Sequence, residues 1–130
     1  AGLMLIGSYG ASAVLLYGAP RSPLAQPRNL LGGHILSAIV GVACYQLFPD
    51  NQPLAAALAV ATAISVMQIT RTLHPPGGAT ALIAVLGPQA VHDTGWLFPV
   101  PVALGAGILL AVALVVNNLS RQHRYPEHWF

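Results

Sequence analysis

A polar segment, residues 70–81, interrupts an otherwise apolar chain and carries the side chains best suited to chemistry. Arg71 and His74 come at the end of an apolar run, and Pro75 and Pro76 follow directly. Pro75 disfavours helical backbone at His74, whereas Pro76 suits the first turn of a new helix. The segment therefore predicts a helix end, a tight break and a second helix start. Such a start carries free N–H groups and a partial positive charge, which favours an anion.

Two interpretations stay open for each ionisable residue of this segment. Arg71 could attract an anion beside the break, or it could lie at the membrane interface and only set topology. A central arginine costs about 2.5–3.5 kcal/mol on insertion scales. His74 could ligate, relay protons or donate to an oxyanion, or it could make a structural hydrogen bond that caps the broken helix. Gly77 and Gly78, with the two prolines, are interpreted as residues that shape the backbone and expose its N–H groups.

Composition places these residues in a membrane protein. Hydrophobic residues make up 55% of the chain and charged residues only 6%, whereas a soluble domain carries about 25% charged residues. The net charge of +2 comes from arginine, because the sequence contains no lysine. We interpret this charge as a topology signal rather than a nucleic-acid-binding surface. The expected surroundings are a lipid bilayer, and no nucleic acid partner is expected.

Five apolar segments follow one another and predict an all-α polytopic membrane helix bundle. Spanning the hydrocarbon core needs about 20 apolar residues. Leu30 to Phe48, Leu54 to Leu73 and Trp96 to Val116 meet this length. Gly2 to Ala19 meets it only if part is irregular, and Pro76 to Leu86 is shorter.

The charges between the segments predict how the chain is threaded. If each segment crosses once, Asp50 and Asp93 share one side, and the opposite side holds Arg21, Arg28, Arg71, Arg121 and Arg124. Arginine is enriched on the cytoplasmic side of membrane proteins. We therefore predict a transmembrane domain over residues 1–118, lacking its first helix, and a polar cytoplasmic tail over residues 119–130. A bacterial inner membrane is the expected location.

An internal repeat appears when the chain is shifted by 68 positions. Gly10 then aligns with Gly78, and Ser12 aligns with Thr80. In the threading above, the two copies run in opposite directions, which predicts an inverted repeat with one short broken helix in each copy. Many transporters with such repeats bind substrate where discontinuous helices meet near the midplane. Ser12 and Thr80 would either line a pathway or only let helices approach closely.

Other polar residues of the spans are candidates of the same kind. His34 lies one turn into its span, where it would line a pathway or make a satisfied polar contact. Asn29, with Gln26 and Arg28, forms a predicted pathway mouth, although phosphate headgroups would explain Arg28 equally well. The predicted spans contain no Asp or Glu, which argues against a carboxylate proton relay. The histidines are far apart and no HExxH occurs, so neither a metal nor a cofactor is expected.

Three stretches of the sequence resemble one known family. Residues 74–81, His-Pro-Pro-Gly-Gly-Ala-Thr-Ala, are similar to the signature of the HPP family of integral membrane proteins. Residues 23–29, including Pro27 and followed by Gly33-His34, resemble its second marker, and residues 10–13 resemble its third. The resemblance implies a multi-span bundle, described for the family as four-span. It also implies transport, since some members are described as nitrite transporters of chloroplasts and cyanobacteria.

Together these features predict membrane transport of a small inorganic anion, with nitrite as the first candidate, through a pathway at the two broken helices. A membrane anchor or sensor module without transport is the alternative. An intramembrane serine hydrolase, using Ser12 or Thr80 with His34 or His74, is less well supported because Gly-Ala-Ser-Ala is a poor nucleophile motif. The chain is predicted not to be an enzyme. Its small-residue helix faces also fit a homo-oligomer.

Overall fold

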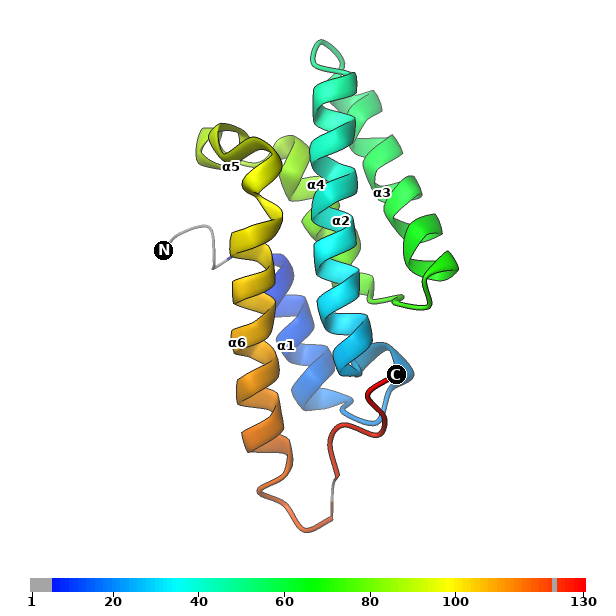
Figure 1. The fold of residues 1–130 in the computed structure, drawn as a ribbon, viewed down its shortest axis with the longest axis vertical. Coiled ribbons are helices and arrows are strands. Elements are labelled where there is room, and N and C mark those ends of the chain that lie inside the picture. The colour runs from blue at the N-terminus through cyan, green and yellow to red at the C-terminus, as the bar shows by residue number, and fades with distance from the viewer. Residues whose placement is uncertain (1–5, 123) are drawn as a thin grey trace.

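The protein is a bundle of helices, as the apolar segments predict (Figure 1). The computed structural model describes residues 6–122 and 124–130, and every regular element within them is helical. In chain order these elements are α1 (Ser8–Gly18), the 3₁₀ helix η2 (Pro23–Ala25), α2 (Pro27–Leu47), α3 (Gln52–Ile69), α4 (Pro75–Leu86), α5 (Gln89–Thr94), the 3₁₀ helix η3 (Gly95–Leu97) and α6 (Pro99–Asn117).

Three of the described helices, α2, α3 and α6, are long and apolar enough to cross a membrane. The 21 residues of α2 extend about 31 Å at 1.5 Å per residue, which matches a hydrocarbon core of about 30 Å. The shorter α1 and α4 reach only about 16–18 Å by the same rise, so neither spans the core alone. On α6 the exposed side chains form an apolar stripe, as expected of a helix that faces lipid: Leu104, Ile108, Val112 and Val115.

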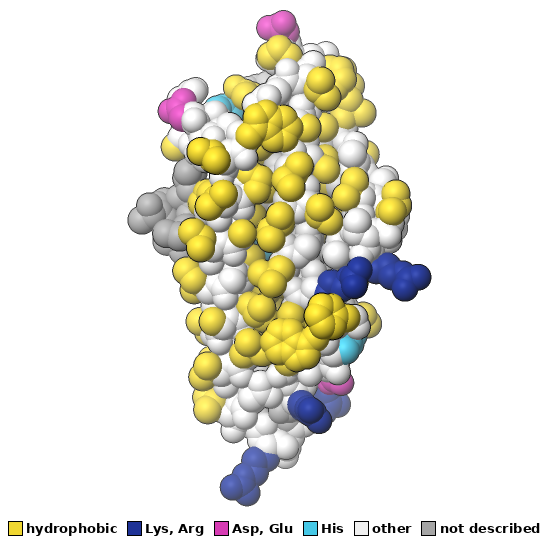
Figure 2. Space-filling model, in the orientation of Figure 1, with side chains coloured by type: hydrophobic (Ala, Val, Ile, Leu, Met, Phe, Trp, Pro, Cys, Tyr) yellow, Lys and Arg dark blue, Asp and Glu magenta, His cyan; other side chains and the backbone are white. Residues whose placement is uncertain are grey.

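The chain reverses direction at each end of the bundle (Figure 1). In this view residues 19–26 and the C-terminal tail lie at the lower end, whereas the α2–α3 turn and α5 lie at the upper end. Figure 2 shows arginine side chains over the lower part of the visible face and acidic side chains at the upper end, with a further acidic group below. The predicted threading, in which the arginines share one side of the membrane, stays a prediction.

The third span ends earlier than its composition suggests. α3 stops at Ile69 rather than at the predicted Leu73. Arg71 adopts φ 56°, in the left-handed region, and the Thr72 N–H donates to the Met67 carbonyl at 2.8 Å. This is the hydrogen-bond pattern of a left-handed helix cap, which is usually built with glycine.

Smaller differences concern the other boundaries. The predicted loop between Gly87 and Gly95 contains the short helix α5, and η3 takes the place of the first turn predicted from Trp96. The α2 helix starts three residues before Leu30, because a proline fits its first turn. Residues 2–5 of the first predicted segment lie outside the described residues.

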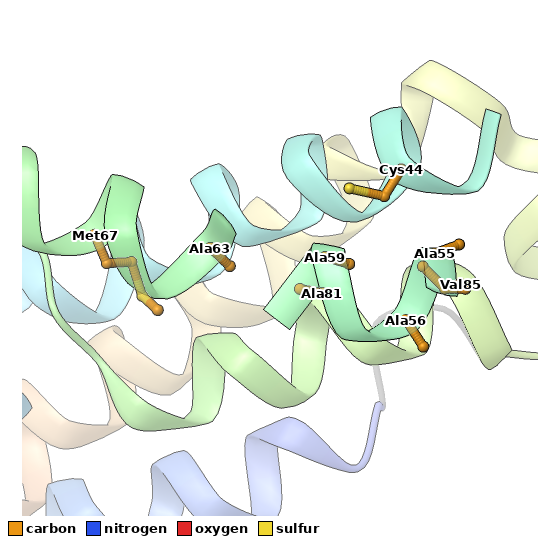
Figure 3. Packing of buried hydrophobic residues seen from close by; sticks show 8 residues of the cluster. All are labelled: Cys44, Ala55, Ala56, Ala59, Ala63, Met67, Ala81 and Val85. Atoms are coloured by element: carbon orange, nitrogen blue, oxygen red, sulfur yellow. The ribbon is translucent and has the colours of Figure 1, made fainter. Parts of the chain in front are cut away.

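Small side chains let α2, α3 and α4 pack closely (Figure 3). Membrane helices associate through such small-residue contacts, because lipid supplies no hydrophobic drive between them. Gly41 on α2 shows how close the approach is: a Cβ added there would lie 2.5 Å from the Cβ of Ala84 on α4. The buried cluster between the three helices consists of Cys44, Ala55, Ala56, Ala59, Ala63, Met67, Ala81 and Val85.

Candidate functional site

Five buried polar side chains form one continuous hydrogen-bonded chain, which we call the serine–histidine network. Ser8 and Ser12 come from α1, His34 comes from α2, His74 precedes α4, and Thr80 belongs to α4. None of the five is more than 1% exposed. The network therefore lies wholly inside the bundle, where the two short helices meet.

Ser12 is the centre of the network. Its Oγ lies 2.7 Å from Nε2 of His34 and 2.8 Å from Nε2 of His74. The other ring nitrogen of His74 donates to the backbone carbonyl of Leu24 at 2.8 Å, since a carbonyl oxygen can only accept. One hydroxyl thus joins two imidazoles, and the backbone at η2 fixes one of them.

Thr80 continues the network on the far side of His34. Its Oγ1 lies 2.7 Å from Nδ1 of His34, and its hydroxyl donates to Oγ of Ser8 at 2.8 Å. The pairs Ser8–Thr80 and Ser12–His74 run in opposite order along the chain, so α1 and α4 are antiparallel. The two short helices thus approach each other, as the repeat predicts, while the inverted repeat as a whole stays a prediction.

Local sequence explains how these side chains point inward. Ser8 and Ser12 are four residues apart and lie on the same face of α1. His74 has extended backbone, φ −140° and ψ 104°, as expected of a residue before proline. Gly33 and Gly77 lack side chains at the contact between α2 and the start of α4: a Cβ on Gly77 would lie 2.8 Å from the Gly33 carbonyl oxygen.

The first turn of α2 holds the break between α3 and α4. The Arg28 guanidinium donates to the Thr70 carbonyl, and the Asn29 amide donates to the Leu73 carbonyl, both at 2.8 Å. These bonds satisfy backbone oxygens that a helix end leaves free. Asn29, predicted to lie at a pathway mouth, is engaged in fixing the break.

Gln26 joins the loop before α2 to the C-terminal tail. Its side chain is fully buried; its amide donates to the Pro20 and Ser22 carbonyls, and its oxygen accepts from the Glu127 N–H at 2.8 Å. Pro27, next in the chain, occupies the first turn of α2. The second sequence marker therefore ties loop, helix and tail together.

Tyr125 anchors the tail on the same loop. Its hydroxyl donates to the Ala25 carbonyl at 2.8 Å, and its side chain is buried. Burial raises the pKa of Tyr125 to about 12, and the neighbouring Tyr17 adds to the rise. The polar tail predicted over residues 119–130 thus packs against the arginine-bearing end of the bundle.

Only part of the predicted site comes together in the network. Ser12, His34, His74 and Thr80 do so, from three segments far apart in the sequence. Arg71 lies apart from them as an exposed residue in the break.

The glycines at the two helix starts also lie apart from the network. Gly10 is exposed, with open space where a side chain would be. Gly78 is half-buried, and a side chain there would face Val60 of α3. The two broken helices therefore meet through their polar side chains rather than through these glycines.

The start of α4 differs from the open anion cradle that the sequence suggests. Pro75 and Pro76 have no N–H to offer. The Gly77 N–H donates to the His74 carbonyl at 2.8 Å. The backbone here is shaped as predicted, but in this conformation the polar groups facing the interior are side chains.

Two residues in or beside the serine–histidine network were not predicted as site residues. Ser8 accepts from Thr80, and its four-residue spacing from Ser12 is a signal that could have identified it. Tyr9 packs its ring edge-on against His34, with centroids 5.2 Å apart, and donates to the Val102 carbonyl at 2.8 Å. No motif in the sequence points to that tyrosine.

Two apolar grooves flank α4. One, of about 610 Å³, lies between α1 and α4 and includes Ala11, Val14 and Pro75; the other, of about 570 Å³, lies between α3 and α4 and includes Val60 and Leu82. No network side chain lines either groove. Every buried side-chain N or O atom of the described residues has a hydrogen-bond partner. The interior around the network is closed in this conformation.

The described residues contain no group of three or more His, Cys, Asp or Glu side chains placed to hold a metal ion. Two histidines are adjacent, with ring centroids 5.1 Å apart. Both are already committed to hydroxyl and carbonyl partners. The network side chains can donate and accept hydrogen bonds, and its imidazoles can carry a proton.

Comparisons with known proteins agree with this architecture. Two curated relatives are transmembrane proteins of Dictyostelium discoideum, 50% identical over 130 residues and 48% identical over 131. Each match covers 98% of this chain but only 46% and 42% of the relatives, so the chain spans less than half of their length. No solved structure matches the chain. The family model described as "HPP, transmembrane region" matches residues 1–126, and with its apolar spanning helices the chain belongs to the HPP family of integral membrane proteins.

Proposed function

We propose that this chain is the membrane core of a transporter for a small monovalent inorganic anion, with nitrite as the first candidate. The observation that carries the proposal is the serine–histidine network, a fully buried polar cluster where two short, antiparallel helices meet. Ionisable side chains inside membrane proteins are costly and commonly mark a transport or proton pathway. Transporters with discontinuous helices bind their substrates at such junctions.

The chemistry of the interior favours an anion over a cation. The buried polar side chains of the described residues are hydroxyls, amides and imidazoles, with no carboxylate among them. Hydroxyl and imidazole groups can donate hydrogen bonds to an oxyanion, whereas sites for hard cations rely on carboxylate and carbonyl oxygens.

A series of polar groups leads from the arginine-bearing end toward the network. Arg28 is exposed and contacts the Thr70 carbonyl, and the Thr70 hydroxyl lies 2.7 Å from that of Thr72. Thr72 is nearly buried, and His74 follows two residues later. These groups support an entrance at the break, with the exposed Arg71 as an attracting charge.

The closed interior corresponds, in this proposal, to one conformation of an alternating cycle. Opening would separate α1 from α4, which breaks the Ser12–His74 and Ser8–Thr80 hydrogen bonds. The apolar grooves on either side of α4 offer space for that helix to shift. We propose that the arginine-bearing end faces the cytoplasm, following the positive-inside rule. The bacterial inner membrane stays a prediction, since the relatives compared are from Dictyostelium discoideum.

Flux through proteoliposomes tests the proposal. The full-length protein is reconstituted, and uptake of nitrite, nitrate, formate and chloride is followed against empty liposomes. We expect saturable nitrite uptake that falls at least tenfold in Ser12→Ala and in His74→Asn. Ser65→Ala is the matched control, because that exposed hydroxyl bonds only within its own helix, to Ala61.

Two outcomes contradict the transport assignment. One is the absence of flux for every anion, which would favour the anchor or sensor alternative that a packed interior also suits. The other is undiminished flux in both network variants while their unfolding temperatures stay at the wild-type value.

A serine hydrolase is the second candidate, because one distance favours it. The 2.8 Å separation of Ser12 Oγ and His74 Nε2 falls within the roughly 2.6–3.2 Å that a nucleophile and its base require. Ser12 is 0% exposed, however, so in this conformation no acyl substrate reaches it. A serine-reactive probe that labels the wild type but not Ser12→Ala would favour this candidate over transport.

A further inference from the structure

We infer that the serine–histidine network is a binding site for one proton, held on His34, and that this proton crosses the membrane together with the anion. The proton site rests on the hydrogen-bond contacts of the network, which fit two arrangements of hydrogens that differ by one proton. Its coupling to an anion rests on the proposed function. The five contacts of the network limit where its hydrogens can lie.

The Leu24 carbonyl oxygen, at one end of the network, can only accept a hydrogen bond. His74 must therefore carry a hydrogen on Nδ1, and the Nε2 of a neutral His74 is then an acceptor. The hydroxyl of Ser12 has one hydrogen, and its contact with that Nε2 uses it. Ser12 has nothing left to donate to its second imidazole.

The contacts of His34 with Ser12 and Thr80 determine its protonation state. Since Ser12 has no second hydrogen, the Nε2 of His34 must donate to it. The Thr80 hydroxyl donates its single hydrogen to Ser8. With that hydrogen in use, Nδ1 of His34 must donate to Thr80. An imidazole that donates from both nitrogens is an imidazolium. With Thr80 as the donor to Ser8, the network thus contains one proton more than neutral side chains supply.

A neutral arrangement exists and differs by one reversal. If Ser8 donates to Thr80, the Thr80 hydrogen points to Nδ1 of His34, which then needs no hydrogen of its own. All five contacts are still satisfied, and every donor points from Ser8 toward Leu24. Binding one proton and reversing the Ser8–Thr80 hydrogen bond are therefore a single linked event.

The surroundings of His34 supply no negative charge to balance the proton. On α1 it faces Tyr9, whose hydroxyl is engaged with a backbone carbonyl, and at the start of α4 it faces His74. Met67 of α3, the side chain bonded by Ser37 next to the network, is not ionisable. The two charged residues at the break are Arg71, which lies in it, and Arg28, which bonds to the Thr70 carbonyl; both are exposed and positive. Among the described residues, the buried set includes no Asp or Glu.

An unbalanced buried charge is strongly unfavourable. A monovalent anion that enters with the proton makes the site neutral overall, so each favours the binding of the other. An N–H bond forms on His34 when the proton binds and breaks when the proton leaves, and no other covalent bond changes. One proton and one anion bind on one side and are released on the other, which makes the transport electroneutral.

Wild-type stoichiometry is the first test. Proteoliposomes of the full-length protein, with a pH-sensitive dye inside, receive an inward nitrite gradient at equal pH on both sides, and empty liposomes give the background from nitrous acid. We expect one proton per nitrite and a rate that does not change when potassium and valinomycin set different membrane potentials. Nitrite uptake without proton uptake, or uptake that follows the potential, would overturn the inference and leave the proposed function standing.

Nitrogen-15 NMR of histidine side chains is the second test and requires no transport. In the purified protein, lowering the pH or adding nitrite should produce an imidazolium signal that is absent from His34→Gln, beside any signals of histidines outside the network, which both proteins share. His92→Gln is the matched control, because that ring lies outside the network, stacked on Tyr45. The same set of imidazolium signals in the wild type and in His34→Gln, under either condition, would overturn the proton site. A signal that responds to pH but not to nitrite would overturn only the coupling.

Discussion

Gly33 and His74 lie so close together that a Cβ added to Gly33 would sit 2.5 Å from the Cβ of His74. The same added atom would lie 3.1 Å from the Thr72 carbonyl oxygen. The break before α4 therefore lies directly on the α2 backbone, one residue before His34. This contact brings both imidazoles within reach of the single hydroxyl of Ser12.

Replacing Gly33 by alanine should disturb this contact. The new methyl group has rigid neighbours on two sides, so we expect a loss of about 1–3 kcal/mol in unfolding free energy, typical of overpacking. Gly107→Ala is the control, since a Cβ there meets nothing within 4 Å. Thermal unfolding in detergent measures both variants. Equal unfolding temperatures for the two variants would show that α2 and the break are not in close contact.

Substitutions of Arg71 should affect the stability of the protein and its anion flux in different ways. Its φ of 56° lies in the left-handed region, which costs a residue with a Cβ about 1–2 kcal/mol. Arg71→Gly should relieve this strain and stabilise the protein by roughly 1 kcal/mol, whereas Arg71→Ala keeps the strain. Both variants should lose anion flux if the guanidinium attracts the substrate.

Unfolding temperature and nitrite flux, measured on both Arg71 variants, check this prediction. If Arg71→Gly proves less stable than Arg71→Ala, the left-handed backbone at residue 71 is not a source of strain. If flux stays at the wild-type level in both, Arg71 only sets topology.

The fold could be predicted because lipid-facing helices need long apolar runs, and prolines and arginines mark their ends. α2, α4 and α6 start or stop within a few residues of the predicted positions. The end of α3 could not be predicted in this way. The left-handed cap that ends the helix contains Arg71 at the position where glycine is usually found. The sequence therefore has no local signal that the helix stops at Ile69.

Part of the site could also be predicted, because a motif and the repeat mark several of its residues. His74 and Thr80 belong to one motif, and the repeat linked Ser12 to it. Nothing in the sequence specified that His34 lies between Ser12 and Thr80, because that depends on how α2 packs across both short helices. Tyr9 and the Leu24 carbonyl enter through tertiary contacts alone.

Tyr125 predicts a pH-dependent attachment of the tail. Burial first, and Tyr17 second, raise its pKa to about 12 from the ordinary tyrosine value of 10.0. A group with a raised pKa in the folded state contributes stability that is fully present below pH 10 and is lost as the pH rises toward and through 12. We expect the tail to become accessible to protease over that alkaline range.

Tyr125→Phe is the matched variant for this prediction. It removes the bond to the Ala25 carbonyl, which should cost about 1–3 kcal/mol, because a buried acceptor loses its partner. It should also abolish the difference in protease sensitivity between pH 9 and pH 11. Limited proteolysis across this range compares the two proteins. The same pH profile in both would show that other groups control the tail.

Thr80 should control the proton affinity of the network through its hydroxyl. Thr80→Val keeps the shape but leaves Nδ1 of His34 and Oγ of Ser8 without their partner. We expect a loss of about 1–3 kcal/mol in stability for an unsatisfied buried group. The variant should destabilise the protonated form of His34 more than the neutral form, because the Nδ1–H of the imidazolium then has no acceptor. The pH at which nitrite uptake is half-maximal should therefore fall by about one unit or more.

Thr80→Ser distinguishes the contribution of the hydroxyl from that of the methyl group, because it keeps the first and removes the second. It retains both hydrogen bonds and loses one buried methyl, worth about 1 kcal/mol, so its pH profile should match the wild type despite lower stability. Nitrite uptake between pH 5 and pH 8, together with thermal unfolding, measures both quantities in each variant. An acid shift of similar size in Thr80→Ser would show that packing, rather than the hydroxyl, sets the proton affinity of His34.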